Sequence, residues 1–309
     1  MFELWQRYAL AGGAVGLLLL GLLFWVVFVN GTEAPPAAVS ETATTTDEVV
    51  EVEPEPEFPR VLGQSVEGRD IEHYRFGNGT THVLLVGGVH GGYEWNSILL
   101  AYEMIDHIEA NPDFVPEELT IDIIPDLNPD GTYAATGLTG RFVAADITDY
   151  SMHETGLGRF NANNVDLNRN FGCDWAPEST WRGQVVSAGT EAFSEPEAQL
   201  LRELVLETEP VAAAFWHSRA NAVFASECDD GSLPLTLDIM NAYANAANYM
   251  AIPVFDAYPI TGDVEGWLAS IGIAAITVEL EGRLTPEWER NRAGTAAMLE
   301  QIVEHISHD

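Results

Sequence analysis

The stretch HVLLVGGVHGGYEW at residues 82–95 predicts a buried strand, a glycine-rich turn and the start of a helix. Residues 83–86 are all apolar and are followed directly by two glycines. A short apolar run that ends at turn residues indicates a strand buried on both faces. Further runs of this kind lie at 119–125 (LTIDIIP), 211–216 (VAAAFW) and 274–280 (AAITVEL).

Helical patterns alternate with these strands, at 94–109, from 196 to 206, at 236–250 and at 285–307. The segment SEPE at 194–197 predicts a capping box at the start of the second helix. Alternating strands and helices favour a single α/β domain over residues 60–309, with a central mixed, largely parallel, twisted sheet covered by helices on both faces. Ligands bind such sheets at the carboxyl ends of the strands.

The composition excludes whole classes of function. The 309 residues include 13 arginines and no lysine against 48 acidic residues, and the net charge is −35. A nucleic-acid-binding protein needs a basic face, so no nucleic acid is expected as a partner. The two cysteines, Cys173 and Cys228, are too few for a disulfide framework and form either one bridge or two free thiols.

The N-terminal region predicts a membrane anchor. Residues 9–29 are uncharged over a length that, as a helix, spans about 30 Å, the thickness of the bilayer core. Arg7 precedes this run and Arg60 is the next cation, so residues 1–8 are expected to be a short cytoplasmic N-terminus and the main domain to be extracytoplasmic, at a cell surface or in a periplasm. A cleaved signal peptide is the alternative. The acidic, Pro/Glu/Thr-rich residues 30–59 predict a disordered linker.

Residues that suit a metal ion follow two of the predicted strands. His90 and Glu94 lie four apart where the helix of 94–109 begins, so a helical first turn would place both side chains on one face. His217 directly follows the strand 211–216. Two imidazoles and a carboxylate are suitable zinc ligands that leave one position open. The alternative is a turn histidine and a glutamate that interacts with the helix dipole.

The segment RFNANNVDLNRNF at 159–171 contains two arginines among polar residues. Arginine binds carboxylates through paired hydrogen bonds, so Arg159 and Arg169 indicate an anionic ligand. The alternative is that they pair with acidic residues of the fold. The remaining histidines have no matching partners in the sequence and are expected mostly at the surface: His73, His82, His107, His153, His305 and His308.

Six separated motifs lie between residues 60 and 300: GGVHGGYEW, LNPDG, RFNANNVDLNRNF, FWHS, YPITGDVEGW and TVEL. In this order they resemble the motifs of the zinc carboxypeptidases of the carboxypeptidase A type and their bacterial cell-wall relatives. The chain departs from the family at its first motif, where three residues instead of two separate His90 from Glu94. We expect the two adjacent glycines of the turn to absorb the extra residue.

The resemblance implies a role for each matching residue. One Zn²⁺ ion would be held by three ligands: His90, Glu94 and His217. The reacting groups would be the general base Glu279 and Arg159, which polarises the scissile carbonyl. The terminal carboxylate of a peptide would be gripped by Asn168 and Arg169 and covered by Tyr258. Asp166 would orient the ring of His90. Glu281, two residues beyond Glu279, would share its strand face, so only the family pattern selects the base.

The family pattern also places Glu265, seven residues after Tyr258, at the floor of the side-chain pocket, with Asp263 nearby. Acidic residues there would favour a basic terminal residue, unless Glu265 turns to solvent. The expected enzyme is a membrane-anchored zinc carboxypeptidase that acts on peptides with a free terminal carboxylate, including cell-wall stem peptides. The alternatives are an amidase or deacylase of small acyl-amino acids, separable by its substrates, and an inactive peptide-binding module, separable by its lack of zinc.

Overall fold

The computed structural model describes residues 57–308 except 230 and 257. The predicted cytoplasmic N-terminus, the predicted transmembrane anchor at 9–29 and all of the predicted linker before residue 57 lie outside the described residues. Within the part that the structure describes, no helix is both long and apolar enough to cross a membrane.

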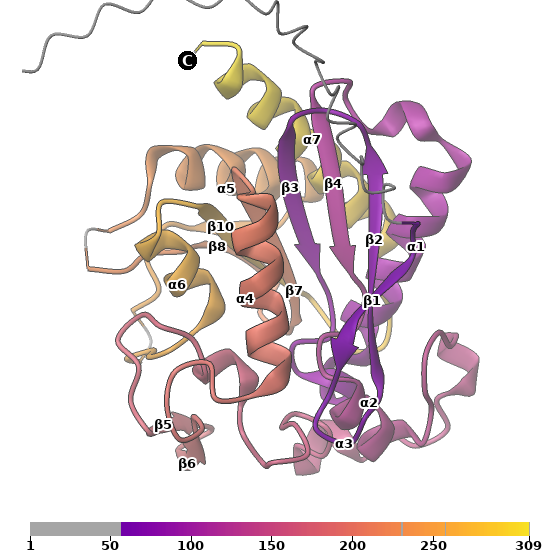
Figure 1. The fold of residues 1–309 in the computed structure, drawn as a ribbon, viewed down its shortest axis with the longest axis vertical. Helices are drawn as coiled ribbons and strands as arrows, with labels where there is room; N and C mark the ends of the chain where they lie inside the picture. Colours follow the sequence, from indigo (N-terminus) through magenta and orange to yellow (C-terminus); the bar gives the residue numbers. More distant parts are fainter. Residues whose placement is uncertain (1–56, 230, 257, 309) are drawn as a thin grey trace, which may run out of the picture. The chain divides into compact units, whose positions relative to one another are not determined.

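An eight-stranded sheet forms the centre of the domain, in the order β1-β2-β4-β3-β7-β10-β8-β9 (Figure 1). Its strands are β1 Arg60–Gln64, β2 Asp70–Gly77, β3 Thr81–Val86, β4 Leu119–Ile124, β7 Ala212–Ser218, β8 Ala222–Ala225, β9 Met250–Ile252 and β10 Ala274–Leu280. A separate hairpin consists of β5 Glu178–Trp181 and β6 Gln184–Ser187.

The sheet is mixed, as the sequence predicts, and its parallel part lies in the middle. Strands β4, β3, β7 and β10 pair in parallel. The flanking pairs β1-β2, β2-β4 and β8-β10 are antiparallel, and β8-β9 is parallel. The four central strands are the four apolar runs of the sequence. Because their carboxyl ends lie at one edge, the residues that follow them gather there.

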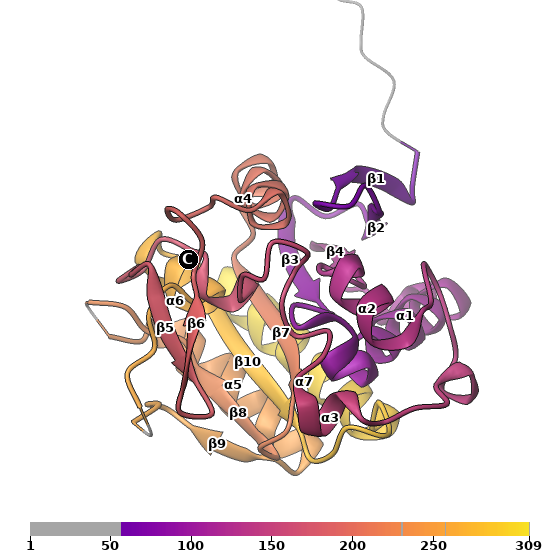
Figure 2. The same ribbon diagram turned by 90° about the horizontal axis from the view of Figure 1, so that it is seen from below.

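Helices cover both faces of the sheet (Figures 1 and 2). They are α1 Trp95–Ala110, α2 Pro129–Thr136, α3 Met152–Thr155, α4 Pro196–Thr208, α5 Pro234–Ala247, α6 Val264–Ser270 and α7 Trp288–Ile306. Helices α1, α5 and α7 pack on one face and share an apolar core with Val83 and Leu85 of β3. Helices α4 and α6 pack on the other and share an apolar core with Leu84 and Val86. Burial on both faces explains why β3 is apolar throughout.

The sequence did not predict the outer strands or the short helices. Strands β1, β2, β8 and β9 are partly exposed or very short, so they carry no continuous apolar run. The predicted capping box is wrong: α4 has Glu195 as its N-cap and makes no side-chain capping hydrogen bond. Ser194 Oγ donates instead to the Glu195 side chain at 2.8 Å and accepts from the Asn170 amide at 3.0 Å.

Candidate active site

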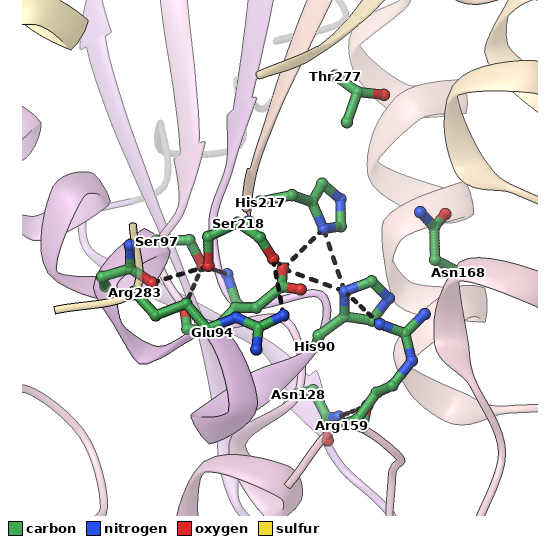
Figure 3. Close-up of polar contacts among 12 residues, drawn as sticks. His90, Glu94, Ser97, Asn128, Arg159, Asn168, His217, Ser218, Thr277 and Arg283 are labelled. Carbon is green, nitrogen blue, oxygen red and sulfur yellow. Dashed lines mark hydrogen bonds and ion pairs between the residues drawn. The ribbon is translucent and has the colours of Figure 1, made fainter. Parts of the chain in front are cut away.

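The predicted metal ligands meet at the carboxyl ends of β3 and β7 (Figure 3). His90 lies in the turn after β3, Glu94 ends the 3₁₀ helix η1 (Gly91–Glu94), and His217 lies near the end of β7. All three are at least 95% buried. Together they line a cavity of about 610 Å³. We call these residues the ligand triad.

The three facing atoms of the ligand triad are almost equidistant. His217 Nδ1 lies 3.1 Å from His90 Nδ1 and 3.0 Å from Glu94 Oε2, and His90 Nδ1 lies 3.1 Å from the same oxygen. Tetrahedral zinc holds such atoms about 3.4 Å apart, given ligand distances of about 2.1 Å. The residues therefore fit zinc. Within the described residues, this is the one group of His, Cys, Asp and Glu side chains with metal-ligand geometry.

The turn that joins His90 to Glu94 differs from the predicted one. Residues Gly91–Glu94 form a 3₁₀ turn, and α1 begins only at Trp95, so the two ligands do not share an α-helical face. Gly91 has a φ of +45°, and a Cβ there would lie 2.8 Å from the carbonyl oxygens of Asn128 and Gly158. The extra residue of the motif is thus absorbed by a glycine that no other residue can replace without strain.

The far nitrogen of each imidazole faces a carboxylate. His90 Nε2 lies 3.4 Å from Asp166 Oδ1, and His217 Nε2 lies 3.6 Å from Glu265 Oε1. Metal-bound histidines generally have such partners, which fix the ring and its tautomer. Asp166 thus lies where the family pattern predicts it. The proximity of Glu265 to His217 was not predicted, because it depends on how α6 packs against β10, the strand next to β7.

The charges of the site favour a cation between the ligands. Burial works against the charged imidazole, but the carboxylates of Glu265 and Glu94 raise the pKa of His217 to about 10. Burial likewise works against the charged form of Glu94, yet the two imidazoles hold its pKa well below the usual value. Both shifts favour a positive charge between the ligands, as expected of a site that concentrates negative charge.

Glu279 lies beside the ligand triad on β10, paired in register with His217 of β7. Its Oε2 is buried and has no hydrogen-bond partner among the described residues. Burial, together with the negative charge of Glu94, raises its pKa to about 7. Glu281, the competing candidate, lies beyond the end of β10, where it is exposed and pairs with Arg290 at 3.1 Å. The two glutamates therefore do not share a strand face, and Glu279 alone of the two lines the cavity.

Arg159 is fixed by Asp166 beside the first ligand. Its Nε and Nη2 donate to Asp166 Oδ2 at 3.0 and 2.8 Å. Its Nη1 lies 3.2 Å from His90 Nδ1 (Figure 3). The guanidinium carbon also lies 4.8 Å from the ring centre of Trp181. Burial works against the charged form of Asp166, but Arg159 and the His90 ring lower its pKa strongly. The positive charge is therefore held next to the metal position.

Asn168 and Arg169 belong to the short 3₁₀ helix η4 (Leu167–Arg169), and both line the cavity. The backbone N–H of Val264 donates to Asn168 Oδ1 at 2.9 Å, which fixes the oxygen and leaves the amide NH₂ as the free end. Arg169 is buried, donates through Nη1 to the carbonyl of Asn168, and has no partner for its Nε among the described residues. Both side chains thus keep donors for an anionic ligand.

The other predicted substrate-binding residues also line the cavity. Tyr258 is 47% exposed and contacts the ring of Phe255, with ring centres 4.8 Å apart. Glu265 is buried and does not turn to solvent: Thr277 Oγ1 donates to its Oε1 at 2.8 Å. Burial and the neighbouring Glu265 carboxylate raise the pKa of Asp263 to about 6. The two acidic groups are therefore close enough to interact.

Cys173 and Cys228 form a disulfide at the rim of the cavity, with their Cα atoms 6.3 Å apart. It joins the loop after η4 to the loop after β8. Two asparagines of the segment 159–171 hold the loop that carries the site residues. Asn161 and Asn163 both donate to Glu195 Oε2, at 2.7 and 2.8 Å, which explains polar residues there without a ligand.

The other histidines are expected mostly at the surface, but two of them interact with a buried carboxylate. His73 is fully buried, and its Nε2 lies 2.7 Å from Asp122 Oδ1. His82 is partly buried, and its Nδ1 lies 2.6 Å from Asp122 Oδ2. We call these three residues the Asp122 cluster. Its partners come from β2, β3 and β4, and the antiparallel strand β2 was not predicted.

The comparisons with known proteins agree with this site. Residues 45–287 match the family model described as zinc carboxypeptidase, so the chain belongs to the zinc carboxypeptidase family. It is therefore a zinc metallopeptidase of the carboxypeptidase class, as the resemblance of its motifs predicts, and His90, Glu94 and His217 form its candidate zinc site. No curated protein sequence matches the chain.

Several solved structures share the fold. Murein-tripeptide amidase MpaA from Escherichia coli O157 has a TM-score of 0.57 at 21% identity, covering 80% of this chain and 92% of that one. Carboxypeptidase A from Helicoverpa armigera has a TM-score of 0.59 at 22% identity, covering 78% and 68%. Bovine thrombin-activatable fibrinolysis inhibitor, solved with a tick carboxypeptidase inhibitor, has a TM-score of 0.61 at 18% identity, covering 81% and 90%.

Proposed function

We propose that this enzyme hydrolyses the last peptide bond of peptides that end in a free carboxylate. One observation carries the proposal: the ligand triad shares a single cavity with a buried carboxylate that has an unpaired oxygen, Glu279, and with two side chains that keep free donors, Asn168 and Arg169. A metal position, a base and an anion site within one cavity are the requirements for an exopeptidase.

The groups around the metal position would each supply one part of the chemistry. A zinc ion held by three protein ligands supplies Lewis acidity, which makes water a nucleophile near neutral pH and polarises a carbonyl. Glu279, with a pKa of about 7, takes the proton from the attacking water and gives it to the departing amine. Arg159, held by Asp166, supplies positive charge where the oxyanion develops.

Asn168 and Arg169 would bind the terminal carboxylate through the amide NH₂ and the guanidinium, and Tyr258 would cover the bound residue. Anchoring that carboxylate at a fixed distance from the ligand triad confines cleavage to the terminal residue. Asp263 and Glu265 would accept a basic terminal side chain, because a cation placed between two interacting buried carboxyl groups relieves their repulsion.

An extracytoplasmic enzyme with a single N-terminal membrane anchor is part of this proposal. The uncharged run at 9–29 supports the anchor, and the Cys173–Cys228 disulfide supports an oxidising compartment. Cell-wall stem peptides are the proposed natural substrates, and the fold shared with a murein-tripeptide amidase supports them. Fractionation of cells, followed by protease treatment of intact cells, would test the compartment: an inaccessible protein that stays in the soluble fraction would refute it.

The activity test uses zinc-loaded protein and peptides that differ only in the last residue, each with a free or an amidated carboxyl terminus. We expect cleavage of the free forms, fastest with Lys or Arg at the end, and its loss on chelation. Glu265→Gln should weaken the preference for basic residues. Cleavage of acyl-amino acids in place of peptides would assign the chain to the amidase alternative, and full zinc occupancy without turnover to a binding module.

A further inference from the structure

Cations are rare in this chain, and most of them are neutralised. Of the twelve described arginines, seven form an ion pair with a carboxylate: Arg60, Arg69, Arg75, Arg141, Arg159, Arg290 and Arg292. Five do not: Arg169, Arg182, Arg202, Arg219 and Arg283. Three of these five, Arg169, Arg219 and Arg283, line the cavity of the candidate active site. In a chain with 48 acidic residues, such a set of unpaired cations indicates an anionic ligand.

Arg169 belongs to the proposed terminal carboxylate site, but Arg219 and Arg283 have no role in the reaction described above. Arg283 makes only long hydrogen bonds to backbone carbonyls, at 3.5 Å to His153 and 3.4 Å to Ser218. Its Nε is buried and has no partner among the described residues. The guanidinium lies over the ring of Tyr93, 4.1 Å from the ring centre, which fixes its plane. Arg219 is exposed, and its side chain has no hydrogen-bond or ion-pair partner among the described residues.

These two arginines lie where the cavity continues into a second one. A neighbouring cavity of about 1030 Å³ shares both of them as lining residues. Four glutamates also line it, and three of these are paired: Glu281 and Glu287 with Arg290, and Glu289 with Arg292. The carboxylates of the second cavity are thus largely compensated by other arginines, while Arg219 and Arg283 form no ion pair with any of them.

The position of Arg283 relative to the ligand triad indicates which part of a bound peptide would contact the two arginines. In Figure 3 the Arg283 guanidinium and Asn168 lie on opposite sides of His90. A terminal residue bound by Asn168 and Arg169 places the scissile carbonyl at the ligand triad. The residue before that bond then extends towards Ser218, whose carbonyl contacts Arg283.

We propose, resting on the carboxypeptidase function above, that Arg219 and Arg283 bind the side-chain carboxylate of the penultimate residue, so that the enzyme prefers peptides with Glu or Asp before the cleaved bond. The cavity then has two regions of opposite charge. Asp263 and Glu265 make it acidic where the terminal side chain binds, and Arg219 and Arg283 make it basic on the other side of the metal position. The preferred substrate ends in an acidic residue followed by a basic one.

The test compares two peptides that end in Glu-Arg and Gln-Arg and are otherwise identical. We expect the zinc-loaded protein to show a kcat/KM about tenfold higher for the Glu peptide, the gain typical of a charge-assisted hydrogen bond. Arg283→Gln and Arg219→Gln should each reduce this ratio while cleavage of the Gln peptide continues. Because Arg219 is exposed, its variant is expected to fold even if Arg283→Gln does not. Higher salt should also lower the ratio.

Arg202→Gln is the matched control, because Arg202 is also unpaired but stacks on Phe193 away from the cavity, 4.9 Å from the ring centre. The ratio of kcat/KM between the Glu and Gln peptides should be the same for Arg202→Gln as for the wild type. Binding of both peptides to the Glu279→Gln protein, measured by calorimetry, should show the same discrimination without turnover. Equal rates for the two peptides, or a ratio that neither arginine variant changes, would overturn the proposal while the proposed function stands. Failure to cleave either peptide would instead reject the function itself.

Discussion

The ligand triad and the Asp122 cluster each combine two imidazoles with one carboxylate, yet their hydrogen bonds differ in kind. In the Asp122 cluster every acceptor meets a donor: Asp122 Oδ1 accepts from Arg75 at 2.7 Å as well as interacting with His73, and Oδ2 is taken by His82. His73 Nδ1 accepts from Arg60 at 3.0 Å. In the ligand triad the three facing atoms are potential acceptors that lie 3.0–3.1 Å from one another. The donors near them are farther away: Arg159 Nη1 lies 3.2 Å from His90 Nδ1, and the Ser218 N–H lies 3.3 Å from Glu94 Oε2.

This difference separates a metal site from a structural site better than composition does. A satisfied cluster gains little from an ion, because each acceptor atom already has a hydrogen-bond donor. Converging acceptors repel one another until a proton or a metal comes between them. Residue types alone would assign zinc to both clusters, and only the arrangement of donors decides between them.

Removing one imidazole from each cluster tests the contrast most strongly. We expect His217→Ala to lose most of its zinc and to lower kcat/KM by about three orders of magnitude or more, because the remaining two ligands cannot hold a catalytic ion. His73→Ala should keep one zinc ion per chain and most of the activity, at the expense of stability. Elemental analysis of both purified proteins measures this. Full zinc occupancy in His217→Ala would refute the ligand assignment.

Glu279→Gln tests whether the unpaired carboxylate beside the ligand triad does chemistry. We expect kcat to fall by about 10² to 10⁴-fold with zinc fully retained, because a general base is lost but no ligand is. The matched control is Glu281→Gln, since Glu281 is exposed and paired with Arg290 outside the cavity of the ligand triad. A Glu279→Gln protein with normal kcat would exclude this residue from the mechanism.

The sequence predicts the ligand triad better than it predicts the Asp122 cluster, for a physical reason. His90 and His217 follow strands that are apolar throughout, and the carboxyl ends of parallel strands meet in every such sheet. His82 lies on the predicted strand β3, but His73 and Arg75 come from the antiparallel strand β2, which is partly exposed and leaves no clear pattern. The position of Glu265 near His217 and the role of Gly91 depend on tertiary packing and a 3₁₀ turn, so neither could be read from spacing.

Arg219 and Arg283 were also missed, although the sequence carried a signal for them. With 13 cations against 48 acidic residues, each arginine is expected to have a carboxylate partner within reach. Those that remain unpaired after folding are therefore informative, but pairing is a property of the fold. The scarcity of cations makes every arginine a candidate for binding an anion, and only the structure shows which of the described arginines form no ion pair.

Asp122→Asn tests the structural side of the comparison. Asp122 is fully buried and compensates Arg75 and the two histidines, so we expect the substitution to lower the free energy of unfolding by about 3 kcal/mol, as when one partner of a buried ion pair is removed. Asp106→Asn breaks the exposed pair with Arg141 and should cost at most about 1 kcal/mol. Urea unfolding with saturating zinc measures both. Equal losses in the two variants would show that the Asp122 cluster contributes no more than a surface pair.

The smallest predicted effect is a pH dependence that arises from His73. Burial lowers its pKa below 6.5, although the Asp122 carboxylate opposes this shift and the charges of Arg60 and Arg75 add to it. Folded His73 therefore stays neutral at pH values where the unfolded chain binds a proton, and stability falls as the pH drops below 6.5 towards the folded pKa.

His73→Gln removes this contribution, so the wild-type protein should lose stability relative to the variant over that window, by at most about 1.4 kcal/mol per pH unit. His82 also faces Asp122 and is unchanged in both proteins, as are the ligand triad and Asp122 itself, so the difference between the two urea midpoints at pH 7.5 and 5.5 isolates His73. A difference that does not change between the two pH values would mean that His73 binds its proton equally well in the folded and unfolded chains. His73 would then keep its ordinary pKa and become charged beside Asp122 below about pH 6.5, so the Asp122 cluster would not stay neutral over this window.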